Sequence, residues 1–111
     1  MTNIVLKCLS PKRLAGEYTF KSFKALYTWV LENLKRPKGL ANMLVLAVAE
    51  NGEYKSYVQG RCIEVASDVK LGYEAKKLAR EIGLIRGDRY SRKMEVGLKF
   101  AEAVDKILRS P

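Results

Sequence analysis

The chain has 111 residues, 48% of them hydrophobic, which favours a single folded domain over residues 1–111 and excludes a disordered chain. Its 21 lysines and arginines against 12 aspartates and glutamates give a net charge of +9, which favours polyanionic partners, nucleic acid before an anionic membrane surface. There is no membrane-length apolar run and no signal-peptide pattern at the start, so we expect a cytoplasmic protein without a membrane partner. Plentiful lysine, glutamate and arginine beside a single glutamine is compatible with a thermophile.

The N-terminal part predicts a β-hairpin followed by a helix. Residues 3–9 form a short apolar strand that Pro11 ends, and residues 14–20 form the second strand. A helix over residues 22–36 follows, with Ser22 as its N-cap. Its core stripe at helical spacing is Phe23, Leu26, Tyr27, Val30 and Leu34. Trp29 lies about 100° from Val30 around that helix, so it is either covered by another element or exposed as a base-stacking ring.

Residues 40–66 predict a long β-hairpin. Residues 40–49 are nearly all apolar, and the Asn51-Gly52 pair suits a two-residue type I′ turn. Residues 54–66 then return as an alternating strand. Lys55, Tyr57 and Arg61 share one face in this register, where they either dock a nucleic-acid strand or form a solvated edge with Tyr57 packed on Leu46.

The C-terminal part predicts two helices separated by a basic loop. The first helix starts at Ser67 or Asp68 and ends at residue 82, before Gly83. Its inward face consists of Leu71, Ala75, Leu78, Ala79 and Ile82. Residues 85–93 form the most basic loop, in which Asp88 is a candidate cap for the last helix.

The last helix, from about residue 88 or 91 to residue 109, carries two apolar stripes. The first stripe is Tyr90, Met94, Leu98, Ala101, Val104 and Leu108. The second stripe is Val96, Phe100, Ala103 and Ile107. Two stripes mean that both sides of the helix are covered, by its own domain or by a second copy. We therefore expect a homo-oligomer through the second stripe.

These elements predict an α+β fold of order β-β-α-β-β-α-α, with an antiparallel sheet of about four strands and helices packed on one face. This order and charge balance are similar to those of the archaeal ThermoDBP single-stranded DNA-binding proteins, although no sequence motif is shared.

Catalytic motifs are absent from the sequence, which contains no histidine, no P-loop, no GxGxxG and no GxSxG. We therefore expect a non-enzymatic protein with no catalytic residue, no metal site and no cofactor. Cys8 and Cys62 both lie in predicted strands. They are either buried thiols or, if their strands are neighbours, a cross-strand disulfide.

The leading functional hypothesis is nucleic-acid binding, with single-stranded DNA or RNA preferred to duplex. Cations bind phosphates and aromatic rings stack on bases. The candidate residues are Lys12, Arg13, Trp29, Arg36, Lys38, Lys55, Tyr57, Arg61, Arg86, Arg89, Tyr90, Arg92 and Lys93.

Two alternatives remain open. Residues 78–95 resemble a helix-turn-helix, which implies a dimeric DNA-binding regulator that reads bases with Ser91, Arg92 and Glu95. The turn is about one residue too long for that family, and Tyr90 stands where an aliphatic residue is usual. The other alternative is an oligomeric protein-interaction module that uses the second stripe of the last helix.

Overall fold

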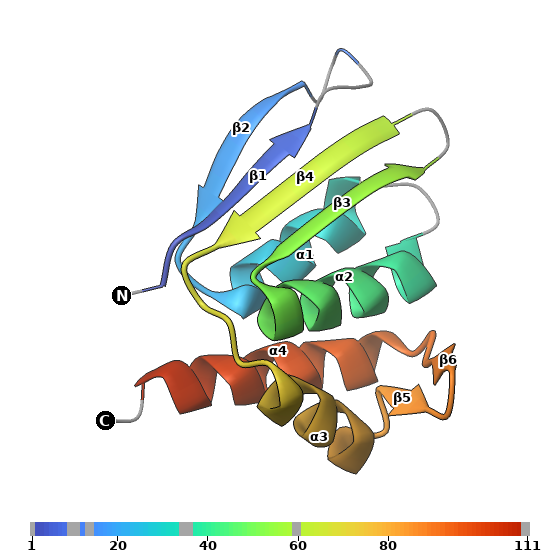
Figure 1. The fold of residues 1–111 in the computed structure, drawn as a ribbon. Helices are drawn as coiled ribbons and strands as arrows, with labels where there is room; N and C mark the ends of the chain where they lie inside the picture. Colours follow the sequence, from blue (N-terminus) through green and yellow to red (C-terminus); the bar gives the residue numbers. More distant parts are fainter. Residues whose placement is uncertain (1, 9–11, 13–14, 34–36, 59–60, 110–111) are drawn as a thin grey trace.

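The computed structural model describes residues 2–8, 12, 15–33, 37–58 and 61–109, the side chains of residues 37, 38, 56–58, 61 and 62 excepted. Its first layer is a four-stranded antiparallel sheet in the order β2-β1-β4-β3 (Figure 1). The strands are β1 (Ile4–Cys8), β2 (Gly16–Phe20), β3 (Glu53–Val58) and β4 (Arg61–Ser67). The predicted α+β class and four-stranded antiparallel sheet are confirmed.

Four helices lie on one face of this sheet, in two layers (Figure 1). The middle layer is α1 (Phe23–Asn33) and α2 (Pro37–Asn51), and the outer layer is α3 (Tyr73–Ile82) and α4 (Met94–Arg109). A small hairpin of β5 (Ile85–Arg86) and β6 (Arg89–Tyr90) connects α3 to α4. The core fills both interfaces of the middle layer, with Ile4 and Leu6 on the sheet side and Phe100 and Val104 on the side of α4.

The first strand of the predicted long hairpin is wrong, because residues 37–51 form α2. This helix lies between the sheet and the outer helices, so it is buried almost all round, from Ala41 to Ala49. A helix covered on every side is apolar on every side and shows no amphipathic period. Gly52 follows it with φ 80°, and its N–H donates to the Val48 carbonyl at 2.8 Å. The Asn51-Gly52 pair therefore ends a helix and makes no type I′ turn.

The second strand of that hairpin is two strands, because the chain reverses between Val58 and Arg61, which are paired in β3 and β4. The sheet therefore keeps four strands, but the element order is β-β-α-α-β-β-α-β-β-α. The predicted order is wrong, and the likeness to ThermoDBP proteins loses its basis. In β1 and β4, Cys8 is buried and pairs in register with Ile63, next to Cys62, whose side chain lies outside the described part.

The first helix agrees with its prediction over the described residues. The Ala25 N–H donates to Ser22 Oγ at 3.1 Å, so Ser22 is the N-cap. Four members of the predicted stripe, all except Leu34, are fully buried, and Leu34 lies outside the described residues. Trp29 is partly buried and packs on Tyr18 and Phe20 of β2, with ring centroids 4.8 and 6.2 Å away. Its indole ring covers the edge of the sheet.

The third helix starts later than predicted. Gly72 precedes it, and neither Ser67 nor Asp68 caps it. Ser67 Oγ accepts a hydrogen bond from the Val69 N–H, and Asp68 Oδ1 accepts one from the Asn3 N–H, both at 3.0 Å. These short polar side chains stabilise the turn after β4 instead. The C-terminal stop is confirmed, since Gly83 adopts φ 88° and the Leu84 N–H donates to the Ala79 carbonyl.

A carboxylate from α4 caps the start of α1. Asp105 accepts hydrogen bonds from the backbone N–H groups of Phe23 at 2.7 Å and Lys24 at 3.0 Å. These donors belong to the first turn of α1, where they have no partner within the helix. The negative charge also lies at the positive end of the helix dipole. This contact joins the last helix to the first.

We expect Asp105→Ala to lower the free energy of unfolding by about 1–2 kcal/mol, because two helical N–H groups lose their charged acceptor. Asp105→Asn keeps an acceptor oxygen without the charge, so its loss is smaller. Urea unfolding followed by circular dichroism measures both. Glu102→Ala, an exposed site on the same helix, is the control and stays within about 0.5 kcal/mol of wild type. Equal losses for Asp105→Ala and Glu102→Ala would contradict the capping role.

Candidate nucleic-acid interface

Residues 86–93, called here the basic segment, bring five predicted binding residues together, four cations and Tyr90. The hairpin turns at Gly87, whose φ is 59°, and pairs Arg86 with Arg89. The cations Arg86, Arg89, Arg92 and Lys93 are all exposed. Ile85, just before the segment, is buried in the core and anchors it. The segment's one carboxylate, Asp88, lies in the hairpin turn and does not cap α4, which begins at Met94.

Tyr90 gives the basic segment an accessible ring. It pairs in register with Ile85, and 41% of its surface is exposed. Met94, which begins α4, is 53% exposed. Exposed apolar side chains beside guanidinium groups suit a ligand that has both aromatic faces and negative charge.

A buried amide holds the basic segment against the middle layer. Asn42 of α2 is the one fully buried polar side chain among the described residues. Its Nδ2 donates to the carbonyls of Ser91 at 2.6 Å and Lys93 at 3.2 Å. Its Oδ1 accepts from the Tyr27 hydroxyl at 2.5 Å, and that hydroxyl lies 3.3 Å from the Met94 carbonyl. Two helices thus fix the backbone that carries Arg92 and Lys93.

Gly97 of α4 leaves the space for this hydrogen-bonded group. A Cβ at this position would overlap Asn42 Oδ1 and the Tyr27 hydroxyl. The close approach of α4 to α1 and α2 therefore requires a residue without a side chain. The first turn of α4, from Met94 to Gly97, therefore packs against the Tyr27–Asn42 pair.

The start of α2 lies beside the basic segment. A Cβ on Gly39 would come within 3.9 Å of Arg92 Cγ. The first turn of α2 has no acidic residue, and its N-terminus is the positive end of the helix dipole. Lys38 belongs to this turn, although its side chain lies outside the described part, as does the whole of Arg36.

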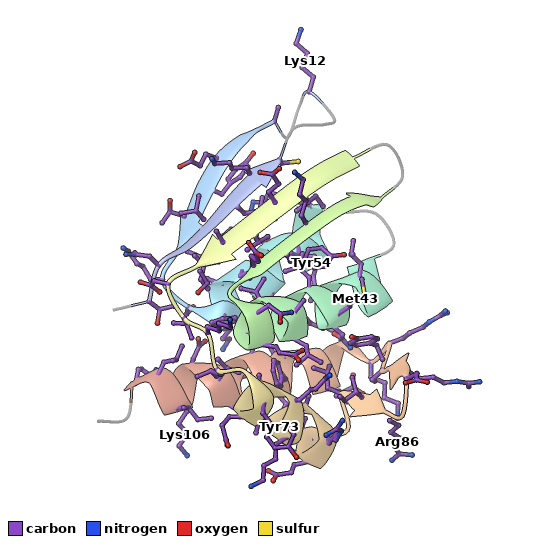
Figure 2. The ribbon with its side chains drawn as sticks, in the orientation of Figure 1. Lys12, Met43, Tyr54, Tyr73, Arg86 and Lys106 are labelled. Atoms are coloured by element: carbon purple, nitrogen blue, oxygen red, sulfur yellow. The ribbon has the colours of Figure 1, made fainter. Side chains whose placement is uncertain are left out.

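The remaining candidates are distributed elsewhere. Figure 2 shows Lys12 at the tip of the β1–β2 connection and Arg86 at the opposite end of the molecule. Arg13 lies outside the described residues, as do the side chains of Tyr57 and Arg61, whose backbones belong to β3 and β4. The predicted constellation is therefore not one continuous surface over the described residues.

The outer face of the sheet is balanced in charge. Glu17, Lys7, Glu64 and Lys55 lie in one row across β2, β1, β4 and β3. Lys55 Nζ is 2.9 Å from Glu64 Oε1. The hydrogen bond from Lys55, then its charge and that of Lys7, lower the pKa of Glu64. Lys55 is therefore paired with a carboxylate of the sheet, and 61% of its side chain is exposed.

The predicted oligomer stripe divides between core and surface. Phe100 is fully buried in its own domain, and Val96 and Ala103 are partly buried. Ile107 is 49% exposed. The inward face of α4 is Gly97, Phe100, Ala101 and Val104, which takes members from both predicted stripes.

The predicted helix-turn-helix is wrong. Residues 83–93 separate α3 from α4 and contain the β5–β6 hairpin. A helix-turn-helix joins its helices by a turn of about 3–4 residues. Ser91 accordingly precedes α4, and its Oγ accepts a hydrogen bond from the Lys93 N–H.

Two structural features of this region were not predicted from the sequence. One is the role of Asn42. The signal for it was an amide side chain inside an apolar run, because a buried amide needs hydrogen-bond partners. The other is Tyr73 at the start of α3, which is 67% exposed. Over the described residues no three His, Cys, Asp or Glu side chains group as metal ligands. A search of the same residues finds no helix with the length and apolar character to cross a membrane.

We expect Gly97→Ala to lower the free energy of unfolding by about 1–3 kcal/mol, because the new methyl group displaces Asn42 and Tyr27. Gly39→Ala in α2 is the matched control, since its methyl group would make only an ordinary van der Waals contact, with Arg92 Cγ. That variant is neutral or stabilising by up to about 1 kcal/mol. Urea unfolding measures both. A neutral Gly97→Ala would show that the close approach is unnecessary.

Tyr27 makes a pH-dependent contribution to stability. Burial, with a smaller effect of the Glu95 carboxylate, raises the pKa of Tyr27 to about 12. Because the folded state favours the neutral phenol, this contribution is complete below pH ~10 and is lost as the pH rises through about 12. We expect wild type to lose stability relative to Tyr27→Phe over that range. Urea midpoints at several pH values measure the difference, and a constant difference would contradict it.

The chain matches no protein-family model, no curated protein and no solved structure.

Proposed function

We propose that this protein binds nucleic acid without acting as an enzyme and prefers single strands, and that the basic segment is its principal contact. The observation that carries this proposal is the exposure of four cations and one tyrosine ring within residues 86–93, on a backbone fixed by Asn42. Phosphates supply the charge that guanidinium groups bind, and bases supply the flat faces that stack on tyrosine.

The exposed ring favours a single strand over a duplex. Bases of a duplex are stacked on one another, whereas unpaired bases present their faces to aromatic side chains. Tyr90 stands beside Arg89 and is separated from Arg92 by one residue, so a phosphate and a neighbouring base can be contacted together. Stacking is tolerant of sequence because every base has a flat face.

The charge contacts make binding sensitive to salt. Each phosphate neutralised on a single strand contributes about −0.7 to the slope of log K against log salt concentration. The net charge of +9 also speeds the encounter with a polyanion at low ionic strength.

We expect wild type to bind a labelled single-stranded oligonucleotide more tightly than the matching duplex, as measured by fluorescence anisotropy over a series of salt concentrations. Arg89→Ala/Arg92→Ala should reduce the salt slope by about 1.4, because two phosphate contacts are lost. Tyr90→Ala should weaken binding by about 1–3 kcal/mol with little change in slope, and Tyr90→Phe should retain affinity.

The control is Lys70→Ala/Lys77→Ala, which removes the same charge from exposed positions before and within α3. Its slope should stay closer to wild type than that of the arginine double variant. No binding of any oligonucleotide by wild type at low salt would disprove the proposed function. Equal effects of the two double variants would show that net charge, and not the basic segment, is responsible.

A further inference from the structure

A cationic groove lies at the other end of α4 from the basic segment. It occupies about 1030 Å³ between the start of α1 and the C-terminal half of α4, and is called here the α1–α4 groove. Five of its lining residues are cations, namely Lys21, Lys24, Lys99, Lys106 and Arg109. They come from both ends of the sequence, so only the fold brings them together.

The charge of the groove favours an anion. Its lining has two carboxylates, Glu102 and Asp105, so five cations minus two carboxylates leave +3. Asp105 is already bonded to the N–H groups of Phe23 and Lys24. The lining also includes Ala103 and Leu108, both partly buried. A ligand with negative groups on an apolar frame, as in a sugar-phosphate chain, fits this combination.

α4 connects the groove to the basic segment. It has 16 residues and is about 24 Å long. Lys99 lies six residues after Lys93, about 9 Å along the axis, and Lys106 lies on the same side one heptad later. Figure 2 shows Arg86 and Lys106 near opposite ends of this helix. Lys99 is therefore the groove cation of α4 that lies nearest to the basic segment, and the exposed Glu95 is the one charged residue between Lys93 and Lys99.

We infer that the α1–α4 groove is a second contact for the same nucleic-acid strand, which leaves the basic segment and follows α4 with its phosphates toward Lys24 and Lys99. This inference rests on the proposed function and adds a minimum ligand length to it. A strand confined to the basic segment needs few nucleotides, whereas one that extends through the groove to Arg109 must cover most of α4. Single-strand binding domains commonly cover about 4–16 nucleotides.

A nucleic-acid strand fits the groove better than a membrane surface. Helices that bind at a membrane surface insert exposed aromatic and leucine side chains between the headgroups. Here the apolar lining residues Ala103 and Leu108 are partly buried within a concave site. The groove offers its charges to a narrow ligand that enters it.

The test measures how the loss of groove cations changes the affinity for oligonucleotides of two lengths. Lys24→Ala/Lys99→Ala removes two exposed groove cations and leaves the backbone cap of α1 in place. For a single strand of about 15 nucleotides we expect about tenfold weaker binding at 0.1 M salt and a slope reduced by about 1.4. For a strand of about three nucleotides we expect a clearly smaller change, since it can extend from the basic segment to Lys99 but cannot fill the groove. Anisotropy titrations of both lengths measure these quantities.

Lys70→Ala/Lys77→Ala is again the charge-matched control, because neither residue lines the groove. The inference is overturned if the groove variant and this control weaken the long strand equally while Arg89→Ala/Arg92→Ala weakens it more; the proposed function then survives. Absence of any wild-type binding overturns both. Binding of wild type to phosphatidylserine vesicles that Lys24→Ala/Lys99→Ala abolishes, with no effect on the long strand, overturns the inference in favour of a membrane surface.

Discussion

The arrangement of this protein depends on one buried amide and the space left for it. Asn42 lies in the middle layer, where an unsatisfied polar group would cost a large part of the domain's stability. Its partners come from α1 and from the segment before α4, and all of its hydrogen bonds form only when these elements meet in one way. Gly97 makes that meeting possible, since any larger residue would separate the helices. The polar contact therefore specifies how an otherwise apolar interface is aligned.

The fold class could be predicted from the sequence, but the path of the chain through it could not. Amphipathic elements such as α1 show their period, because one side is buried and the other is exposed. α2 shows none, since it is enclosed by the sheet and by the three other helices. The length of this segment, 15 residues, indicates a helix, because strands rarely exceed ten residues. Residues 40–49 also contain only two β-branched residues, Val45 and Val48, and a run of alanine, leucine and methionine favours a helix.

The two basic surfaces differ in how visible they are in the sequence. The basic segment is contiguous, so its four cations and its tyrosine stand out as one cluster in the amino-acid sequence itself. The α1–α4 groove joins residues about 80 positions apart, and the contact that brings them together is the Asp105 cap on α1. No local sequence pattern predicts a capping residue that lies in another helix. Conversely, Trp29 packs on Tyr18 and Lys55 pairs with Glu64, two contacts that no sequence pattern predicted.

The alternating row of Glu17, Lys7, Glu64 and Lys55 has a consequence for how the molecule meets a partner. With two positive and two negative groups, this row contributes no net charge to the open side of the sheet. The lining of the α1–α4 groove has a net charge of +3, and the basic segment, with four cations and Asp88, also has +3; both lie on the helical side. The described charges are therefore distributed unevenly, and the field of a polyanion such as the proposed nucleic acid would exert a torque on the molecule during diffusion. Such a torque would turn the helices toward that partner and the sheet away from it.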